Sequence, residues 1–156
     1  SVASGGVDAV VTWEPFASRL REQHGNGIVR WSVQSSQAVY IVYICRPDWL
    51  REHPDLVRRF LTALTQAEGY IARHPYEAKA ILKKRHGHDD AYVERIWPEN
   101  LFSVSLDQAL ITAMEDEARW MIANGLTAEK TVPDFLDYIY PDGLMAVKPE
   151  AVNIIR

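Results

Sequence analysis

The sequence has few of the features that mark several large classes of protein. Its only cysteine is Cys45, which excludes an internal disulfide. No apolar run approaches the roughly 18 residues that a membrane-spanning helix needs. Acidic residues outnumber basic ones by 21 to 17, and the two signs are mixed along the chain. No concentrated basic face is therefore expected, which argues against nucleic-acid binding.

Signatures of catalysis and of metal binding are also scarce. No serine lies in a Gly-x-Ser-x-Gly elbow, and no glycine-rich phosphate loop occurs. Cys45 lies inside an apolar segment, where a thiol usually serves as inert packing. His86 and His88 flank a glycine in a charged stretch, which is more often solvated than metal-binding. We expect no catalytic residues, no cofactor and no metal ion.

The apolar content is that of one ordinary domain, since 47% of the 156 residues are hydrophobic. Three short segments, 7–13, 27–33 and 37–45, have the β-branched and aromatic composition of strands. The last is apolar almost without interruption, which predicts a strand buried on both faces, as in a parallel sheet.

Helical patterns predominate in the second half of the chain. A proline at the first helical position, an apolar stripe or a capping residue marks each one. A capping box from Ser105 to Gln108 opens the longest of the later helices. The predicted helices are 16–22, 54–71, 76–84, 89–97, 105–121, 133–140 and 149–155. The elements together predict an α/β fold, a parallel or mixed sheet flanked by helices, with a helix-rich C-terminal half.

An ordered series of short motifs runs along the chain. It consists of Gly5-Gly6-Val7-Asp8-Ala9, Trp13-Glu14-Pro15-Phe16, Asp48-Trp49-Leu50, His53 to Val57, His74-Pro75 with Glu77-Ala78, Pro133-Asp134-Phe135 and the closing 144–154. In this order and spacing the motifs resemble periplasmic substrate-binding proteins of ABC importers, in the nitrate/sulfonate/taurine class. Relatives of that class that bind thiamine-pyrimidine precursors look similar.

The resemblance implies a two-lobed periplasmic-binding-protein fold of type II, of which this chain is a C-terminal portion. Residues 1–33 would end the second lobe. Residues 34–156 would form the return crossover strand and the C-terminal helices that pack on the first lobe. The whole is treated as one truncated domain. Strands cut off from their neighbours would expose unpaired edges, so we expect the isolated chain to dimerise by strand exchange or to aggregate.

The function implied by the resemblance is capture of a small solute, anionic or sulfonate- or nitrate-like, in an interlobe cleft. A membrane permease would be the partner, and the periplasm or another extracytoplasmic space the location. Two alternatives stay open, a ligand-sensing domain of a membrane receptor and an enzyme like those of thiamine-pyrimidine synthesis. The identity of the ligand stays open as well.

Candidate ligand-binding residues lie where the first predicted strand ends and a helix begins, because ligands of open α/β sheets bind beyond the carboxyl ends of strands. Thr12, Trp13 and Glu14 occupy that point. The Trp13 indole offers a flat apolar wall and one N–H donor. A structural interpretation competes with this one, with Trp13 in the core and Glu14 as an acidic helix cap. Ser36 and Gln37 are further candidates, since they fall in the crossover expected to change conformation on closure.

Overall fold

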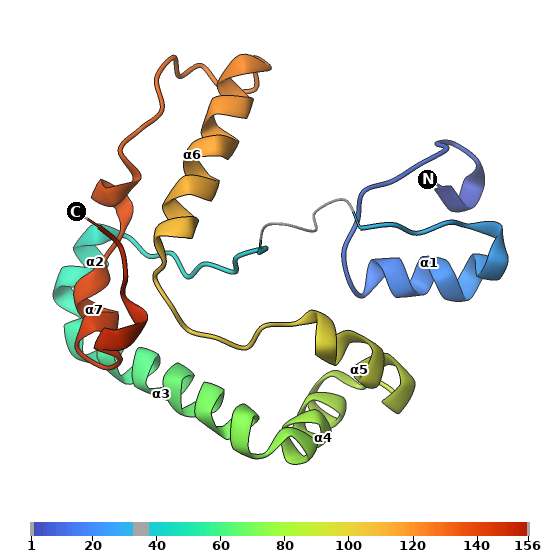
Figure 1. Cartoon of the computed structure of the whole chain (residues 1–156), viewed down its shortest axis with the longest axis horizontal. Coiled ribbons are helices and arrows are strands. Elements are labelled where there is room, and N and C mark those ends of the chain that lie inside the picture. Colours follow the sequence, from blue (N-terminus) through green and yellow to red (C-terminus); the bar gives the residue numbers. More distant parts are fainter. Residues whose placement is uncertain (1, 33–37, 156) are drawn as a thin grey trace. The chain divides into compact units, whose positions relative to one another are not determined.

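The computed structural model describes residues 2–32 and 38–155, and it is built mainly of helices (Figure 1). They group into two compact units, Ser1–Val39 and Tyr40–Arg156. In chain order the α-helices are α1 (Phe16–His24), α2 (Pro47–Glu52), α3 (Pro54–Arg73), α4 (Pro75–His86), α5 (Asp90–Ile96), α6 (Gln108–Ala123) and α7 (Pro141–Met145). Short 3-10 helices are η1 (Val2–Ser4), η2 (Gly25–Gly27), η3 (Trp97–Glu99), η4 (Phe135–Tyr138) and η5 (Pro149–Ala151). The division expected at residue 33 remains a prediction.

The predicted α/β fold is wrong. Within 2–32 and 38–155 the chain forms no sheet, and its β pairing is a single parallel bridge between Leu106 and Val152. The segments 7–13, 28–32 and 38–45 have no assigned strand, although their composition is strand-like. Strand propensity expresses how well a side chain fits a pleated surface beside neighbouring strands. In the described chain no other strand pairs with these segments. Their composition was therefore not enough to form strands, and the sheet on which the predicted two-lobed fold depends is absent from the described residues.

The first unit, Ser1–Val39, centres on a turn and one short helix. The peptide bond between Glu14 and Pro15 is cis, and α1 follows directly. At its other end Gly25 takes a positive φ of 51°, and its N–H donates to the carbonyl of Arg21. A glycine tolerates this conformation because it has no Cβ. The predicted helix after Pro15 is thus confirmed, with an end two residues later than expected.

The second unit, Tyr40–Arg156, is a chain of helices whose starts follow from its prolines. Pro47, Pro54 and Pro75 stand at the beginnings of α2, α3 and α4, where a missing backbone N–H costs no helical hydrogen bond. Asp89 caps α5, since its carboxylate accepts a hydrogen bond from the N–H of Tyr92. These helices confirm the predictions for 54–71, 76–84 and 89–97.

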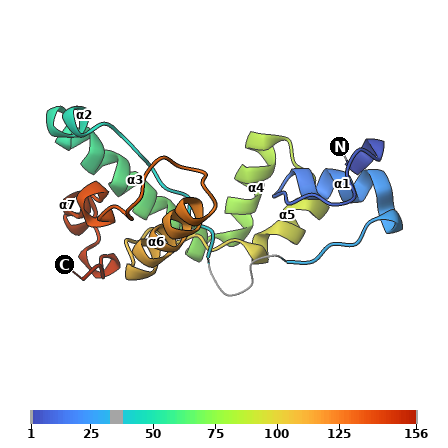
Figure 2. The same ribbon diagram turned by 90° about the horizontal axis from the view of Figure 1, so that it is seen from above.

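One buried contact of this unit joins α7 to α3, which lie side by side in Figure 1 and Figure 2. Leu144 is 3% exposed, and its neighbour Gly143 is also buried. A Cβ added at Gly143 would lie 2.9 Å from Cδ1 of Leu61, so the missing side chain lets the two helices approach. The Lys148 ammonium lies 2.7 Å from both carboxylate oxygens of Glu68 on α3, and this ion pair holds the segment after α7 on the same helix.

The start of α6 differs from the predicted capping box. The helix begins at Gln108, and its cap comes from the C-terminal tail, where Oδ1 of Asn153 accepts from the Gln108 N–H at 3.1 Å. In return the Gln108 side chain accepts from the Ile155 N–H at 3.0 Å. The Ser105 hydroxyl donates to Asp107, and the Gln108 N–H donates to Asn153 and not to Ser105. Short-range spacing did not reveal a cap that arrives from 45 residues away.

The predicted last helix, 149–155, is mostly wrong for the same reason. Only Pro149–Ala151 is helical, as η5. Beyond it the tail runs beside Leu106, whose N–H donates to the Ala151 carbonyl at 2.8 Å and whose carbonyl accepts from Asn153 at 3.0 Å. Pairing with a distant segment therefore replaces the local helix. Across the described residues, none of the helices is both long and apolar enough to cross a bilayer.

Candidate functional site

The candidate site is the turn that leads into α1. The Trp13 carbonyl accepts from the N–H of Ala17 at 3.0 Å, and the Pro15 carbonyl accepts from Arg19 at 3.1 Å. These bonds fix the backbone on the helical side of the turn. Ser18 is 4% exposed and anchors the first turn of α1 in its unit. The side chains around Ser18 are therefore held on a defined piece of backbone.

Trp13 lies on the surface of this turn. Its side chain is 72% exposed and meets Phe16 edge to face, with ring centroids 6.2 Å apart and an interplanar angle of 88°. The Arg19 guanidinium lies over the other ring, 5.8 Å from the centroid of Phe16. Such edge-to-face and cation–π contacts are favourable and orient the groups that make them. Trp13, Phe16 and Arg19 form a ridge of two rings and one cation, called the aromatic ridge below.

Glu14 takes part in the helix start. Its Oε2 accepts a hydrogen bond from the N–H of Ser18 at 3.1 Å, and the side chain is half-buried. A carboxylate at this position is favoured, because the first N–H groups of a helix lack partners and carry a partial positive charge. One carboxylate oxygen is thus engaged by the backbone, and Oε1 is the oxygen left for other interactions.

Of the three remaining predicted site residues, one lies among the described residues and two lie outside them. Thr12 is half-buried and directly precedes the ridge. Ser36 and Gln37 lie outside the described residues. The role of all five predicted residues in ligand contact stays a prediction.

The sequence reasoning did not pick out two members of the aromatic ridge, Phe16 and Arg19. Part of the signal was present, since Phe16 and Arg19 are three residues apart within a predicted helix and neighbours at this spacing meet on one face. A partly buried helix shows the same spacing of side chains. Spacing alone therefore gave no reason to choose these residues as ligand contacts.

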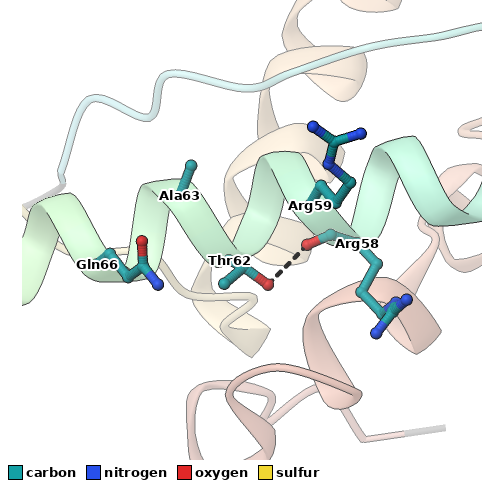
Figure 3. A pocket seen from close by; sticks show the side chains of 5 residues that line it. All are labelled: Arg58, Arg59, Thr62, Ala63 and Gln66. Carbon is teal, nitrogen blue, oxygen red and sulfur yellow. Dashed lines mark hydrogen bonds between the residues drawn. The ribbon is translucent and has the colours of Figure 1, made fainter.

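A hollow on α3 is a separate surface feature (Figure 3). It is open to solvent, has a volume of about 330 Å³ and is lined by Arg58, Arg59, Thr62, Ala63 and Gln66. The two arginine side chains extend in different directions (Figure 3). Arg58 donates to Asp55 at 3.0 Å, and Thr62 donates to the Arg58 carbonyl at 2.8 Å. The groups do not converge on a common point, so the hollow lacks the enclosure of a ligand pocket.

The histidines singled out in the sequence pack against rings. The rings of His86 and His88 stack at 5.7 Å, and His88 lies 4.5 Å from the ring of Tyr92. Among the residues that the structure describes, no group of three or more metal-binding side chains comes together. This part of the chain links α4 to α5.

Asp48, in the first turn of α2, has a lowered pKa. The Arg46 guanidinium donates to its carboxylate, with Nε 3.0 Å from Oδ1, and the backbone N–H of Trp49 adds a second donor. Both contacts favour the charged form and hold the pKa of Asp48 below its ordinary value of 3.8. The stabilisation is present above pH 3.8 and is lost as the pH falls through the lower pKa of the folded state.

We expect the Asp48 carboxyl to titrate below pH 3.8 in the folded chain, and Arg46→Gln to move its midpoint up towards that value. The carboxyl carbon resonance of Asp48, followed by NMR against pH in both proteins, measures this. A wild-type midpoint at or above 3.8 would show that the guanidinium does not hold the carboxylate.

The contacts described for residues 13–19 are a ring pair, a cation over a ring, a helix cap and backbone hydrogen bonds. Exposed rings beside a cation and a carboxylate are groups that bind a ligand by stacking, charge and hydrogen bonding. The structure thus brings such groups together on the surface before α1, and their contact with a ligand stays a prediction.

Comparison with protein-family models gives the family. The model described as NMT1/THI5 like matches residues 1–78, which contain the aromatic ridge, α1, α2 and α3. The chain belongs to this family of nitrate/sulfonate/taurine and thiamine-precursor binding proteins. Most members are binding proteins, and some are biosynthetic. Comparisons with curated proteins and with solved structures gave no match. The resemblance read from the motifs is thereby confirmed.

Proposed function

We propose that this chain belongs to the solute-binding component of an ABC importer and acts outside the cytoplasm. The family is one of binding proteins, and its match includes the turn before α1. The observation that carries the proposal is the exposed Trp13 ring, held against Phe16 on a turn fixed by backbone hydrogen bonds. A membrane permease would receive the solute, and no bond in the solute would be made or broken.

The aromatic ridge suits a small solute with one polar end. Trp13 offers an exposed face for an alkyl chain or a flat ring, and its indole N–H can donate a hydrogen bond. Arg19 adds a cation whose planar guanidinium matches a sulfonate, a nitrate or a carboxylate. This combination favours an anionic solute such as an alkyl sulfonate, which is the first candidate.

A second candidate follows from Glu14. Glu14 follows Trp13 in the sequence, and one of its carboxylate oxygens accepts a hydrogen bond from the N–H of Ser18. An aminopyrimidine would stack on the indole and donate its amino hydrogen to a carboxylate oxygen, whereas an anion would be repelled by the same group. Thiamine-precursor binding proteins are among the members of the family. Binding of an anion would therefore depend on Arg19, whereas binding of an aminopyrimidine would depend on Glu14.

A thermal-shift panel on the 156-residue chain separates these ligands. The compounds are taurine, longer alkyl sulfonates, nitrate, bicarbonate and thiamine-related aminopyrimidines. A bound ligand at about a hundred times its dissociation constant stabilises the folded chain by roughly 2.7 kcal/mol, which is a readily measured shift. We expect at least one compound to give such a shift, and mass spectrometry to recover that compound unchanged.

Trp13→Ala should abolish the shift, because it removes the exposed ring at little cost to folding. Trp31→Ala is the matched control, since Trp31 belongs to the same unit and is 68% exposed against 72% for Trp13. Arg19→Gln should weaken an anion, and Glu14→Gln should weaken an aminopyrimidine. Equal loss of binding in the Trp13 and Trp31 variants would refute a role for the ridge. Conversion of the compound would favour the enzyme alternative.

A further inference from the structure

Two asparagines of the chain stand directly before a glycine, Asn26 before Gly27 and Asn124 before Gly125. In such a pair the backbone nitrogen of the glycine can attack the side-chain amide of the asparagine, because glycine has no Cβ to obstruct the approach. Both pairs are exposed and stand just after the end of a helix, α1 in one case and α6 in the other. The sequence motif is the same, but the hydrogen bonds around the two pairs differ.

Asn124 is held firmly at the C-terminus of α6. Its side-chain Nδ2 donates to the Trp120 carbonyl at 2.8 Å. The Gly125 N–H donates to the Ile122 carbonyl at 3.1 Å, and the following N–H donates to Met121 at 2.9 Å. These two backbone bonds, together with the positive φ of 68° at Gly125, form a Schellman motif. Both the amide that would be attacked and the nitrogen that would attack it are therefore engaged.

The backbone of Asn124 also keeps the reacting atoms apart. Its ψ of 5° places the Gly125 nitrogen on the side of the Asn124 backbone nitrogen, away from the side chain. Attack on Cγ requires the residue to leave this conformation, which breaks the bonds of the Schellman motif. The reaction is then confined to the small fraction of chains in which the end of α6 is open.

Asn26 is held much less firmly. It lies in η2, a single 3-10 turn of three residues that is exposed throughout. In the part of the chain that the structure describes, the Asn26 side chain makes no hydrogen bond. A 3-10 conformation also separates the reacting atoms, but opening it breaks only the bonds of one short turn, whose geometry is poor. The open state should therefore be populated far more often at Asn26 than at Asn124.

We propose that Asn26 is a site of spontaneous deamidation in this chain and that the fold protects Asn124. In the first step the Gly27 nitrogen loses its proton to hydroxide and forms a bond to Cγ of Asn26. The bond from Cγ to Nδ2 breaks, ammonia leaves, and a five-membered succinimide ring remains. Water then opens the ring at either carbonyl carbon and yields aspartate or isoaspartate. Either product carries a negative charge that asparagine lacks.

Peptide mapping by mass spectrometry measures both sites in one sample. The folded 156-residue chain is kept in mildly alkaline buffer, because the attacking nitrogen must be deprotonated. Trypsin cleaves after lysine and arginine, so Asn26 falls in peptide 22–30 and Asn124 in peptide 120–130. We expect deamidated peptide 22–30 to accumulate at least about tenfold faster, since several hydrogen bonds must break at Asn124 and few at Asn26.

The same chain in denaturing urea is the control for the effect of sequence. Without the turn and the Schellman motif, both sites are unprotected Asn-Gly pairs, and their rates should become similar. Deamidation of Asn124 in the folded chain at a rate equal to or above that of Asn26 would overturn the proposal. A ratio of rates that stays the same in urea would also overturn it, because the difference would then come from the neighbouring sequence.

Gly27→Ala tests the attacking group. A Cβ added at Gly27 would meet Cβ of His24 at 4.0 Å, an ordinary contact, and Gly27 is not among the glycines with positive φ. We expect this variant to fold like the wild type and to deamidate several-fold more slowly at Asn26, with the rate at Asn124 unchanged. An unchanged rate at Asn26 would show that the backbone nitrogen of residue 27 is not the attacking group, which would overturn the proposal.

Discussion

Leu144→Ala is expected to lower the free energy of unfolding of the unit Tyr40–Arg156 by about 3 kcal/mol. Leu144 is 3% exposed and lies beside Gly143, where α7 comes closest to Leu61 of α3. Alanine would leave a cavity that the neighbours fill only in part. Since a domain is stable by only about 5 to 15 kcal/mol, this change is a large fraction of the total.

Urea unfolding followed by far-UV circular dichroism measures the effect. Leu101→Ala makes the same chemical change at a side chain that is 85% exposed, and it should stay within about 0.5 kcal/mol of the wild type. If both variants lost the same stability, the burial of Leu144 between α7 and α3 would not stabilise this unit.

Lys148→Met is expected to cost about 2 kcal/mol. The Lys148 and Glu68 side chains are 21% and 22% exposed, and the ammonium also donates to the Val104 carbonyl at 3.1 Å. Removing the ammonium leaves the Glu68 carboxylate partly buried without this partner. A half-removed ion pair of this kind costs more than the pair contributed as a whole.

The double variant Lys148→Met with Glu68→Gln should therefore recover part of the loss, which a double-mutant cycle by urea unfolding would show. Arg58→Met is the control, because its pair with Asp55 is 62% and 86% exposed and such surface pairs contribute at most about 1 kcal/mol. Additive effects of the two substitutions at 148 and 68 would mean that the pair contributes nothing as a unit.

The helices α3, α4 and α5 were predictable because their signals are local, whereas α2 and α7 were not among the predicted helices. A proline at the first position of α3 and α4 and a capping aspartate at α5 act within one turn of the helix they start. The start of α6 was not predictable in this way. Its cap is Asn153, and the pairing of Leu106 with the tail decides the structure of both segments. Contacts between residues this far apart in the sequence produce no periodic pattern from which the helix start could be predicted.

The strands were over-predicted from composition. Segment 38–45 has every local property of a buried strand, yet a strand is completed only by a neighbour. Local propensity therefore predicted a strand that the described chain does not form.

The position of the candidate site is a prediction from the sequence, and the structure adds two neighbouring groups to it. The junction of an apolar segment and a helix pointed to Trp13 and Glu14 before their surroundings were known. The ring of Phe16 and the guanidinium of Arg19 emerged only from three-dimensional contacts. The same contacts gave Glu14 a structural task at the start of α1, beside any role in binding.

The most direct test of the proposed solute-binding function follows the tryptophan indole N–H groups by NMR. The sequence has five tryptophans, and single substitutions such as Trp13→Phe and Trp31→Phe assign their signals. During titration with the compound that gives the largest thermal shift, the Trp13 signal should move in a saturable way while the Trp31 signal stays in place. A ligand that saturates the chain without moving the Trp13 signal would contradict binding at the aromatic ridge.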